Sequence, residues 1–326
     1  MRPPEFWWRK TPGGTIAATA LAPLGFLYGT SVAWKSRRSD PYRASVPVIC
    51  IGNLTVGGTG KTPVAITTAQ MLQETGATPV FILRGYARKT DEIIAVDPEQ
   101  HDWSRVGDEA LLLRRIAPTV VSRDRAWGAR VAEALDASVI VMDDGHQNFS
   151  LAKDLSLVVV DAETSFGNGK IFPAGPLREP VQQGLARADA AILMGDGSPN
   201  LVGFQGPVLR ARLCAMQRLD GRRLVAFAGI GRPDKFFATL RELGATLVET
   251  HAFADHHVYS SAEIARLRAR ATAAKATLMT TEKDFVRLAP GNRDGIQVLP
   301  VRAVFDDETA IARLIAPFAV RRARET

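Results

Sequence analysis

A glycine-rich turn between a strand and a helix is the feature that most constrains the fold of this chain. The run VPVICIG, residues 46–52, is short, apolar and rich in β-branched residues, which predicts a buried strand. The run KTPVAITTAQMLQETG, residues 61–76, predicts a helix that ends at Gly76. Backbone amides between such elements can surround phosphate oxygens, and the helix dipole adds to the attraction. The segment therefore predicts a phosphate-binding loop.

The loop departs from the usual pattern G-x-x-x-x-G-K-[ST] because Thr55 stands where the first glycine is expected. The shorter pattern G-G-x-G-K-[ST] matches. Lys61 would reach the β- and γ-phosphates of a nucleotide, and Thr62 would offer its hydroxyl to Mg²⁺. Pro63 is tolerated in a first helical turn, where its missing N–H has no intrahelical partner. We therefore expect a nucleoside triphosphate with magnesium at these residues: Val56, Gly57, Gly58, Thr59, Gly60, Lys61, Thr62 and Pro63.

Composition limits the partners of the chain. Its 326 residues suit two domains or one large one, and its net charge of +7 suggests an acidic partner such as phosphate, nucleic acid or an anionic membrane. We expect no nucleic acid, because no basic stretch is interleaved with aromatic residues. Cys50 and Cys214 lie in apolar runs and are expected to be core thiols in a reducing compartment. No zinc pattern is present.

The N-terminal region, residues 1–35, is predicted to be a helical segment that associates with a membrane. About 20 mostly apolar residues are flanked by aromatic and basic residues, a length that can span a bilayer. An interfacial helix or helical pair fits better, because Pro23 and two glycines weaken a spanning helix. A signal peptide and a core-packing helix are the alternatives. The residues expected at the membrane surface are Trp7, Trp8, Phe26, Leu27, Tyr28, Trp34, Lys35, Arg37 and Arg38.

The rest of the chain predicts an α/β fold with a mostly parallel sheet. Apolar strand-like runs alternate with helical patterns, which implies helices on both faces of a parallel sheet and ligands at the carboxyl ends of its strands. Glycine, proline and asparagine cluster in residues 195–207, so we place a domain boundary near residue 208. The expected units are a nucleotide-binding domain, 36–208, and a smaller α/β domain, 209–326.

Two acidic sites follow predicted elements. Asp143 and Asp144 end the apolar run ASVIVMDD, where a carboxylate can hold Mg²⁺ directly or through water, although a solvated turn is the alternative. Asp108 stands at the start of a helix, where it is either an N-cap or a catalytic group.

Several basic residues are candidates for contacts with an anion or for acid–base chemistry. The loop ETHAFADHHVYS carries His251, His256 and His257 beside Asp255. The run TTEKDFVRL lacks the N-K-x-D spacing that reads guanine, so we do not expect GTP specificity, and the role of Lys283 stays open. The candidates for an anionic ligand follow a strand or lie in a Pro- and Gly-rich segment: Arg84, Tyr86, Arg88 and Arg178.

Seven motifs in this order closely resemble those of the tetraacyldisaccharide 4'-kinase family, the lipid A 4'-kinases of Gram-negative bacteria. They are GNLTVGGTGKTP, RGYAR, VGDEALLL, DDGHQN, FPAGPLREP, FADHHVYS and TTEKD, and they cover the chain to about residue 284. The resemblance implies a P-loop kinase core, a smaller C-terminal α/β unit and a reaction. ATP would phosphorylate the 4'-hydroxyl of a tetraacyldisaccharide 1-phosphate to give lipid IVA in lipid A biosynthesis.

The resemblance also implies roles for residues. Asp108 would be the base that takes the hydroxyl proton, His256 its partner, and Lys61 a phosphate-binding catalytic residue. Thr62, Asp143 and Asp144 would lie at the metal, and Arg84, Tyr86 and Arg178 near the phosphate and sugars of the glycolipid. The family further implies attachment to the cytoplasmic face of the inner membrane, with no obligate protein partner.

Three other classes of protein share parts of this pattern. A P-loop switch or metal-delivery NTPase shares the glycine-rich loop, but offers no reason for the N-terminal segment or the DHH loop. A kinase for a soluble metabolite and a noncatalytic membrane-associated nucleotide-binding protein are the others. Phosphoryl transfer to an added acceptor would separate the lipid kinase and the metabolite kinase from the NTPase and the noncatalytic nucleotide-binding protein.

Overall fold

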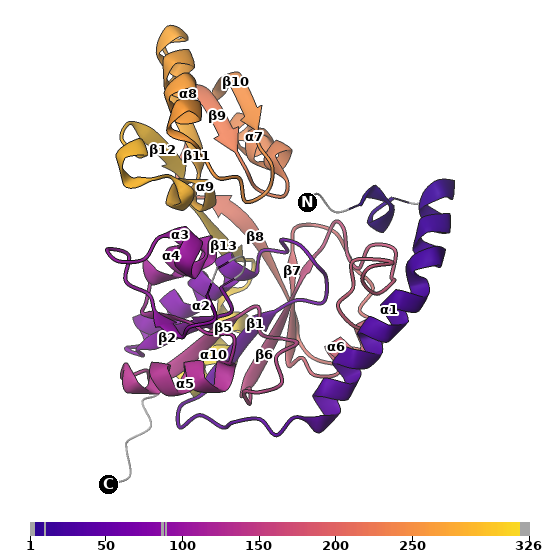
Figure 1. The fold of residues 1–326 in the computed structure, drawn as a ribbon. Coiled ribbons are helices and arrows are strands. Elements are labelled where there is room, and N and C mark those ends of the chain that lie inside the picture. Colours follow the sequence, from indigo (N-terminus) through magenta and orange to yellow (C-terminus); the bar gives the residue numbers. More distant parts are fainter. Residues whose placement is uncertain (1–3, 10, 86–87, 89, 320–326) are drawn as a thin grey trace.

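Nine strands form the larger of two sheets in the computed structural model, which describes residues 4–9, 11–85, 88 and 90–319 (Figure 1). Their order is β13-β8-β7-β6-β1-β5-β2-β4-β3. The strands pair in parallel except at the two edges, where β3 and β13 run antiparallel to their neighbours. The strands are β1 (Val48–Gly52), β2 (Pro79–Leu83), β3 (Ile94–Ala95), β4 (Thr119–Val121), β5 (Val139–Asp143), β6 (Leu155–Asp161), β7 (Ala190–Met194), β8 (Val208–Ala215) and β13 (Val301–Phe305). This is the predicted mostly parallel sheet.

Helices cover both faces of this sheet, because successive side chains of its buried strands point to opposite sides. In β1, Ile49 and Ile51 pack toward α2 and α10, whereas Val48 and Cys50 pack toward α5. The sheet is thus buried on both faces, as its continuous apolar strands predict. The helices of this unit are α2 (Lys61–Glu74), α3 (Trp103–Val106), α4 (Asp108–Arg114), α5 (Arg125–Ala134), α6 (Val181–Leu185), α10 (Glu308–Ile315) and the 3₁₀ turn η3 (Ala316–Phe318).

The smaller sheet has four parallel strands in the order β10-β9-β11-β12. Helix α7 packs on one face through Phe236, Phe237 and Leu240, and α8 packs on the other through Ile264 and Leu267. In Figure 1 this unit stands beyond the carboxyl ends of the larger sheet. Its elements are β9 (Arg223–Ala228), α7 (Pro233–Glu242), β10 (Thr246–Ala252), α8 (Ser261–Ala273), β11 (Thr277–Thr281), α9 (Glu282–Arg287), η2 (Pro290–Asn292) and β12 (Ile296–Leu299). We call residues 216–300 the smaller unit.

The predicted boundary near residue 208 does not coincide with the boundary between the sheets. Strand β8 pairs with β7, and β13 pairs with β8, so residues 208–215 and 301–305 belong to the larger sheet. The Gly- and Pro-rich residues 195–207 form a loop between neighbouring strands of one sheet. The run IQVLPVRAVF is divided between the two sheets at Pro300, which has no N–H to continue a ladder. The smaller sheet is therefore an insertion between β8 and β13.

Helix α1 (Pro12–Arg38) is a single helix that lies along the side of the larger unit (Figure 1). Its contact face contains Gly25 and Gly29, which approach Ile171 so closely that a Cβ on either would stand 2.8 Å from an atom of Ile171. Tyr28 packs edge-on against Phe172, and so does Trp7 of the preceding 3₁₀ turn η1 (Glu5–Trp7).

The outer face of α1 is exposed. Only 17% of its most apolar stretch is buried, and by length and composition alone the helix could cross a membrane. The interpretation as a core-packing helix does not fit, because these large apolar side chains face outward: Ile16, Leu24, Phe26, Leu27 and Trp34.

Candidate active site

The glycine-rich loop joins the end of β1 to the start of α2. Gly57 and Gly60 have φ angles of +121° and +89°, a backbone region that favours glycine. Apart from chain neighbours, no atom of the described residues lies within 4 Å of the position that a Cβ would take on Gly57 or Gly58. Thr59 Oγ1 accepts a hydrogen bond from Asn53 Nδ2 (3.2 Å), which ties the loop to the end of β1. The loop therefore has a fixed turn with an open side, which suits a phosphate group.

Val56 and Pro63 border the loop without an amide directed to its open side. The Val56 N–H donates to Pro176 O (2.7 Å), so it already has a partner. Pro63 lies in the first turn of α2, where its missing N–H breaks no helical bond.

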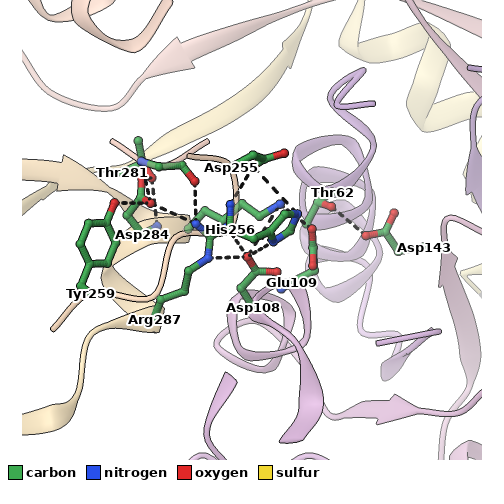
Figure 2. A network of polar contacts seen from close by, with 12 residues as sticks. Thr62, Asp108, Glu109, Asp143, Asp255, His256, Tyr259, Thr281, Asp284 and Arg287 are labelled. Carbon is green, nitrogen blue, oxygen red and sulfur yellow. Dashed lines mark hydrogen bonds and ion pairs between the residues drawn. The ribbon is translucent and has the colours of Figure 1, made fainter. Parts of the chain in front are cut away.

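Thr62 and Asp143 bring the start of α2 against the end of the neighbouring strand β5. Thr62 Oγ1 donates to Asp143 Oδ2 across 2.8 Å (Figure 2). The other oxygen, Asp143 Oδ1, is buried and has no hydrogen-bond partner among the described residues. Burial raises the pKa of Asp143 to about 6, against the opposing charge of Lys61. An unpartnered carboxylate oxygen beside a threonine hydroxyl supplies the oxygen ligands that Mg²⁺ prefers, so these residues fit the predicted metal.

Asp144 has different partners from Asp143: it contacts two basic side chains and not the Thr62 hydroxyl. Arg178 Nη1 and Nη2 donate to its two carboxylate oxygens at 2.7 and 3.1 Å, and Lys61 Nζ lies 3.5 Å from Oδ1. Burial acts to raise the pKa of Asp144, but Lys61 and Arg178 outweigh it and hold that pKa well below its usual range. Burial in turn lowers the pKa of Lys61. The adjacent aspartates thus differ in environment: Asp143 faces a hydroxyl and Asp144 faces two cations.

A second polar cluster lies where the smaller unit meets α4. Asp108, the first residue of α4, is only 3% exposed. Its Oδ2 lies 3.1 Å from His256 Nδ1 and accepts hydrogen bonds from Arg287 Nε (2.7 Å) and Arg287 Nη2 (Figure 2). Burial acts to raise the pKa of Asp108, but hydrogen bonds with the side chains of Glu109 and His256, together with the charges of Lys283 and Arg287, hold that pKa well below its usual range. Asp108 is therefore an ionised acceptor and not only a helix cap.

The DHH loop brings only one of its histidines to this cluster. His256 lies next to Asp108, and its Nε2 is 3.9 Å from Asp255 Oδ1. His257 instead lies 3.2 Å from Glu263 and stacks on Phe253. The geometry therefore supports the predicted pairing of His256 with Asp108.

Glu109 and Lys283 form a second ion pair beside Asp108. Lys283 Nζ donates to Glu109 Oε1 across 2.6 Å and lies 3.8 Å from Asp108 Oδ2. Burial raises the pKa of Glu109, although Lys283 opposes it. Asp108, Glu109 and His256 offer possible ligand atoms within 4.8 Å of one another, but the two carboxylates already pair with cations. We therefore interpret the cluster as an acid–base site.

Sequence reasoning missed Glu109 and Arg287, and it left Lys283 without a role. Lys283 and Arg287 are four positions apart on α9, so they share a helix face, and this spacing was the available signal. Arg84 lies exposed just beyond β2, and its side chain makes no hydrogen bond or ion pair with the described residues. Tyr86 lies outside the described residues.

The two clusters lie close in the fold. Helices α2 and α4 pack against each other, and Thr62 and Asp108 stand at the first turn of each. Figure 2 shows Thr62 and Asp143 in one view with the Asp108 cluster. The glycine-rich loop at the start of α2 therefore lies near the buried carboxylate at the start of α4.

Comparison with known proteins gives one consistent result. The family model described as tetraacyldisaccharide-1-P 4'-kinase matches residues 17–319. A tetraacyldisaccharide 4'-kinase of Paramagnetospirillum magneticum is 50% identical, over 98% of this chain and 100% of that protein. The protein of the same name from Rhodospirillum rubrum is 48% identical, over 97% of each chain.

A solved structure has the same fold. The crystal structure of LpxK from Aquifex aeolicus in complex with ATP superposes with a TM-score of 0.76 at 25% sequence identity, covering 93% of this chain and 99% of that one.

Proposed function

The chain belongs to the tetraacyldisaccharide-1-P 4'-kinase family, and on that premise we propose that it transfers the γ-phosphoryl group of ATP to the 4'-hydroxyl of a tetraacyldisaccharide 1-phosphate. It is a kinase of lipid A biosynthesis, and the product of this transfer is lipid IVA. The observation that carries the residue assignment is the contact of His256 and Arg287 with Asp108, beside the helix that begins with Lys61 and Thr62.

The glycine-rich loop is the proposed site of the ATP phosphates. Its open side, its glycine backbone and Lys61 support this assignment. Thr62 and Asp143 would hold Mg²⁺. Asp144 would instead orient Lys61 and Arg178 through its ion pairs with them. The ion, when bound, neutralises charge on the β- and γ-phosphates. Lys61 would add a second positive charge at the same oxygens.

Asp108 is the proposed proton acceptor. The acceptor's hydroxyl oxygen forms a bond to the γ-phosphorus, and the bond from that phosphorus to the β–γ bridging oxygen breaks, releasing ADP. The hydroxyl proton passes to Asp108. Because phosphoryl transfer depends mainly on positioning and charge neutralisation, an ionised carboxylate that orients the hydroxyl suffices. The hydrogen bond to His256 supports a fixed orientation of that carboxylate.

Helix α1 is the proposed contact with the lipid surface. Its exposed apolar residues include Phe26 and Leu27, and Lys35, Arg37 and Arg38 follow in its last turn. Apolar side chains beside basic ones suit the interface of an anionic membrane. Docking there would let the acyl chains of the glycolipid stay in the bilayer. Arg178 and Arg84 remain proposed contacts for the head of the substrate.

Transfer of label from γ-labelled ATP to a detergent-dispersed tetraacyldisaccharide 1-phosphate, with and without Mg²⁺, tests the proposal. We expect labelled lipid only with Mg²⁺. Lipid-independent release of phosphate without labelled lipid would favour an NTPase and contradict the proposed transfer.

A further inference from the structure

Arg287 is the side chain that joins the core of the smaller unit to Asp108. It is completely buried, and its Nε and Nη2 both donate to Asp108 Oδ2. His256 Nδ1 approaches the same oxygen at 3.1 Å. The other oxygen, Oδ1, accepts a hydrogen bond from the Glu109 N–H at 3.0 Å, and the Glu109 side chain also lies within hydrogen-bonding reach of Asp108. The two oxygens of Asp108 therefore differ: Oδ2 is crowded with donors and Oδ1 is not.

The direction of the Arg287 guanidinium is set within the smaller unit. Nη1 donates to Gly229 O (2.8 Å) and to Asp284 Oδ1 (3.1 Å). Asp284 Oδ1 is itself held by the Tyr259 hydroxyl (2.8 Å) and the Gly229 N–H (3.0 Å). These contacts join α9 to the end of β9 and leave the guanidinium little freedom. Its remaining donors, Nε and Nη2, both point to Asp108 Oδ2, and Nη2 also lies 3.4 Å from His256 Nδ1.

Charged groups from three elements face Asp108. Glu109 follows it on α4, His256 comes from the loop after β10 with Asp255 behind it, and α9 contributes Lys283 and Arg287. Burial alone raises the pKa of a carboxyl group, which would leave Asp108 protonated and unable to accept a proton. Arg287 supplies the closest positive charge, and Lys283, which pairs with Glu109 at 2.6 Å, adds a second positive charge 3.8 Å from Asp108 Oδ2.

We propose that Arg287 is a positioning residue for phosphoryl transfer: it binds Asp108 Oδ2 so that Oδ1 meets the acceptor hydroxyl and receives its proton. The inference rests on the proposed function, since Asp108 has this role only in a kinase. Arg287 acts through Asp108 and its partner His256, so it contributes to the transfer step and not to the binding of ATP.

The test compares the pH dependence of kcat for the full-length wild type, Arg287→Gln and Arg287→Lys, using γ-labelled ATP and the tetraacyldisaccharide 1-phosphate. In Arg287→Gln, the acid limb of the profile should move to higher pH by about one unit or more, because a nearby cation lowers a carboxyl pKa by about that amount. The KM for ATP should stay within about twofold. Arg287→Lys should restore part of the shift, since it keeps the charge without the guanidinium fork.

The position of the limb does not depend on the fraction of folded enzyme, so partial unfolding does not mimic the result. If Arg287→Gln yields no folded protein, the acid limb of Arg287→Lys is compared with that of the wild type. A shift of that limb to higher pH then supports the inference, and an unchanged limb contradicts it. The matched control is Arg268→Gln, which removes a smaller-unit arginine that donates to Asn292 O and Asp294 O and should leave the limb in place.

A fall in kcat by the same factor at every pH, or no fall at all, would overturn the inference while the wild type still labels the lipid. A wild type that labels no lipid would instead overturn the proposed function.

Discussion

Lys61 Nζ lies 3.5 Å from Asp144 Oδ1, so the lysine of the glycine-rich loop faces the carboxylate that follows the adjacent strand. The same carboxylate is held from its other side by Arg178. The lysine of the loop is thus paired with an acidic side chain. The phosphates of ATP would meet a charge that is already in position.

Lys61→Ala should lower kcat at least about 100-fold, because it removes a charge that acts on the transferred phosphoryl group. The measurement is initial rate of lipid labelling at saturating ATP. Lys275→Asn is the matched control, since Lys275 is exposed beyond α8 and asparagine tolerates its positive φ of 49°. Activity of Lys61→Ala close to that of the control would contradict the assignment of the loop.

Asp108→Asn should lower kcat by about 10²- to 10⁴-fold, the usual range for loss of a positioned base, with little change in the KM for ATP. The amide keeps the size of the carboxyl group, and its oxygen can still accept from Arg287. Steady-state kinetics in ATP at saturating lipid separate the two constants. Equal losses in kcat and in ATP affinity would point to a structural or metal-binding role.

Phe26→Gln combined with Leu27→Gln should weaken binding to anionic vesicles about tenfold or more, since each buried apolar side chain contributes about 1.5–3 kcal/mol. Both side chains are exposed on α1. Vesicle co-sedimentation measures the change, with Thr30→Gln on the same helix as the control. Deletion of residues 1–34 should also release the protein, but it would uncover Ile171 and Phe172. Undiminished binding of the double variant would place the membrane contact elsewhere.

Gly25→Ala should lower the free energy of unfolding by about 1–3 kcal/mol, the usual result of overpacking. A Cβ at Gly25 would stand 2.8 Å from the backbone oxygen of Ile171, which cannot move aside easily. Gly13→Ala is the control, because in the part of the chain that the structure describes nothing lies within 4 Å of its Cβ position, and alanine favours a helix. Thermal unfolding of both variants decides: equal midpoints would mean that α1 does not pack closely on Ile171.

His146 should make the protein less stable in mild acid. It is fully buried between Ser156 Oγ (3.2 Å) and Gly184 O (2.9 Å), and burial lowers its pKa from 6.5 to about 3. Below pH 6.5, His146 is protonated in the unfolded chain, whereas in the folded chain it stays neutral until the pH approaches 3. The stability contribution is therefore complete above pH 6.5 and is lost progressively as the pH falls toward 3.

At pH 5 the loss should be about 2 kcal/mol relative to pH 7.5. Urea unfolding at the two pH values, with a chelator present, measures it. Between pH 7.5 and pH 5, the free energy of unfolding of His146→Gln should fall by about 2 kcal/mol less than that of the wild type. Each protein is compared with its own value at pH 7.5. Identical pH dependence in wild type and variant would exclude His146 as the source.

Local sequence predicted the parts of the site that depend on one strand, one turn and one helix. The loop from Gly57 to Thr62 and the aspartates after β5 are of this kind, because strand order and the periodicity of apolar residues place them at one edge of a parallel sheet. The pairing of His256 with Asp108 came from the family resemblance, and the geometry supports it.

Arg287 and Glu109 could not be found in the same way. Arg287 and Asp108 are 179 positions apart, and their contact depends on how the smaller unit meets α4. The division at residue 208 failed for a related reason. A Gly- and Pro-rich stretch marks a loop, but it does not tell whether the next strand joins the same sheet. That depends on strand pairing between distant residues.

The insertion of the smaller unit between β8 and β13 has a consequence for folding during synthesis. Helix α2, which begins with Lys61, is covered by β13 and α10, and the Thr67 hydroxyl donates to Ala303 O at 2.9 Å. Residues 301–318 leave the ribosome only after the whole four-stranded sheet. The smaller unit can thus complete its core while the ATP-binding half still lacks an edge strand and exposes apolar surface. For a nascent chain with an apolar N-terminal helix, this is the interval in which a chaperone or the membrane surface matters most.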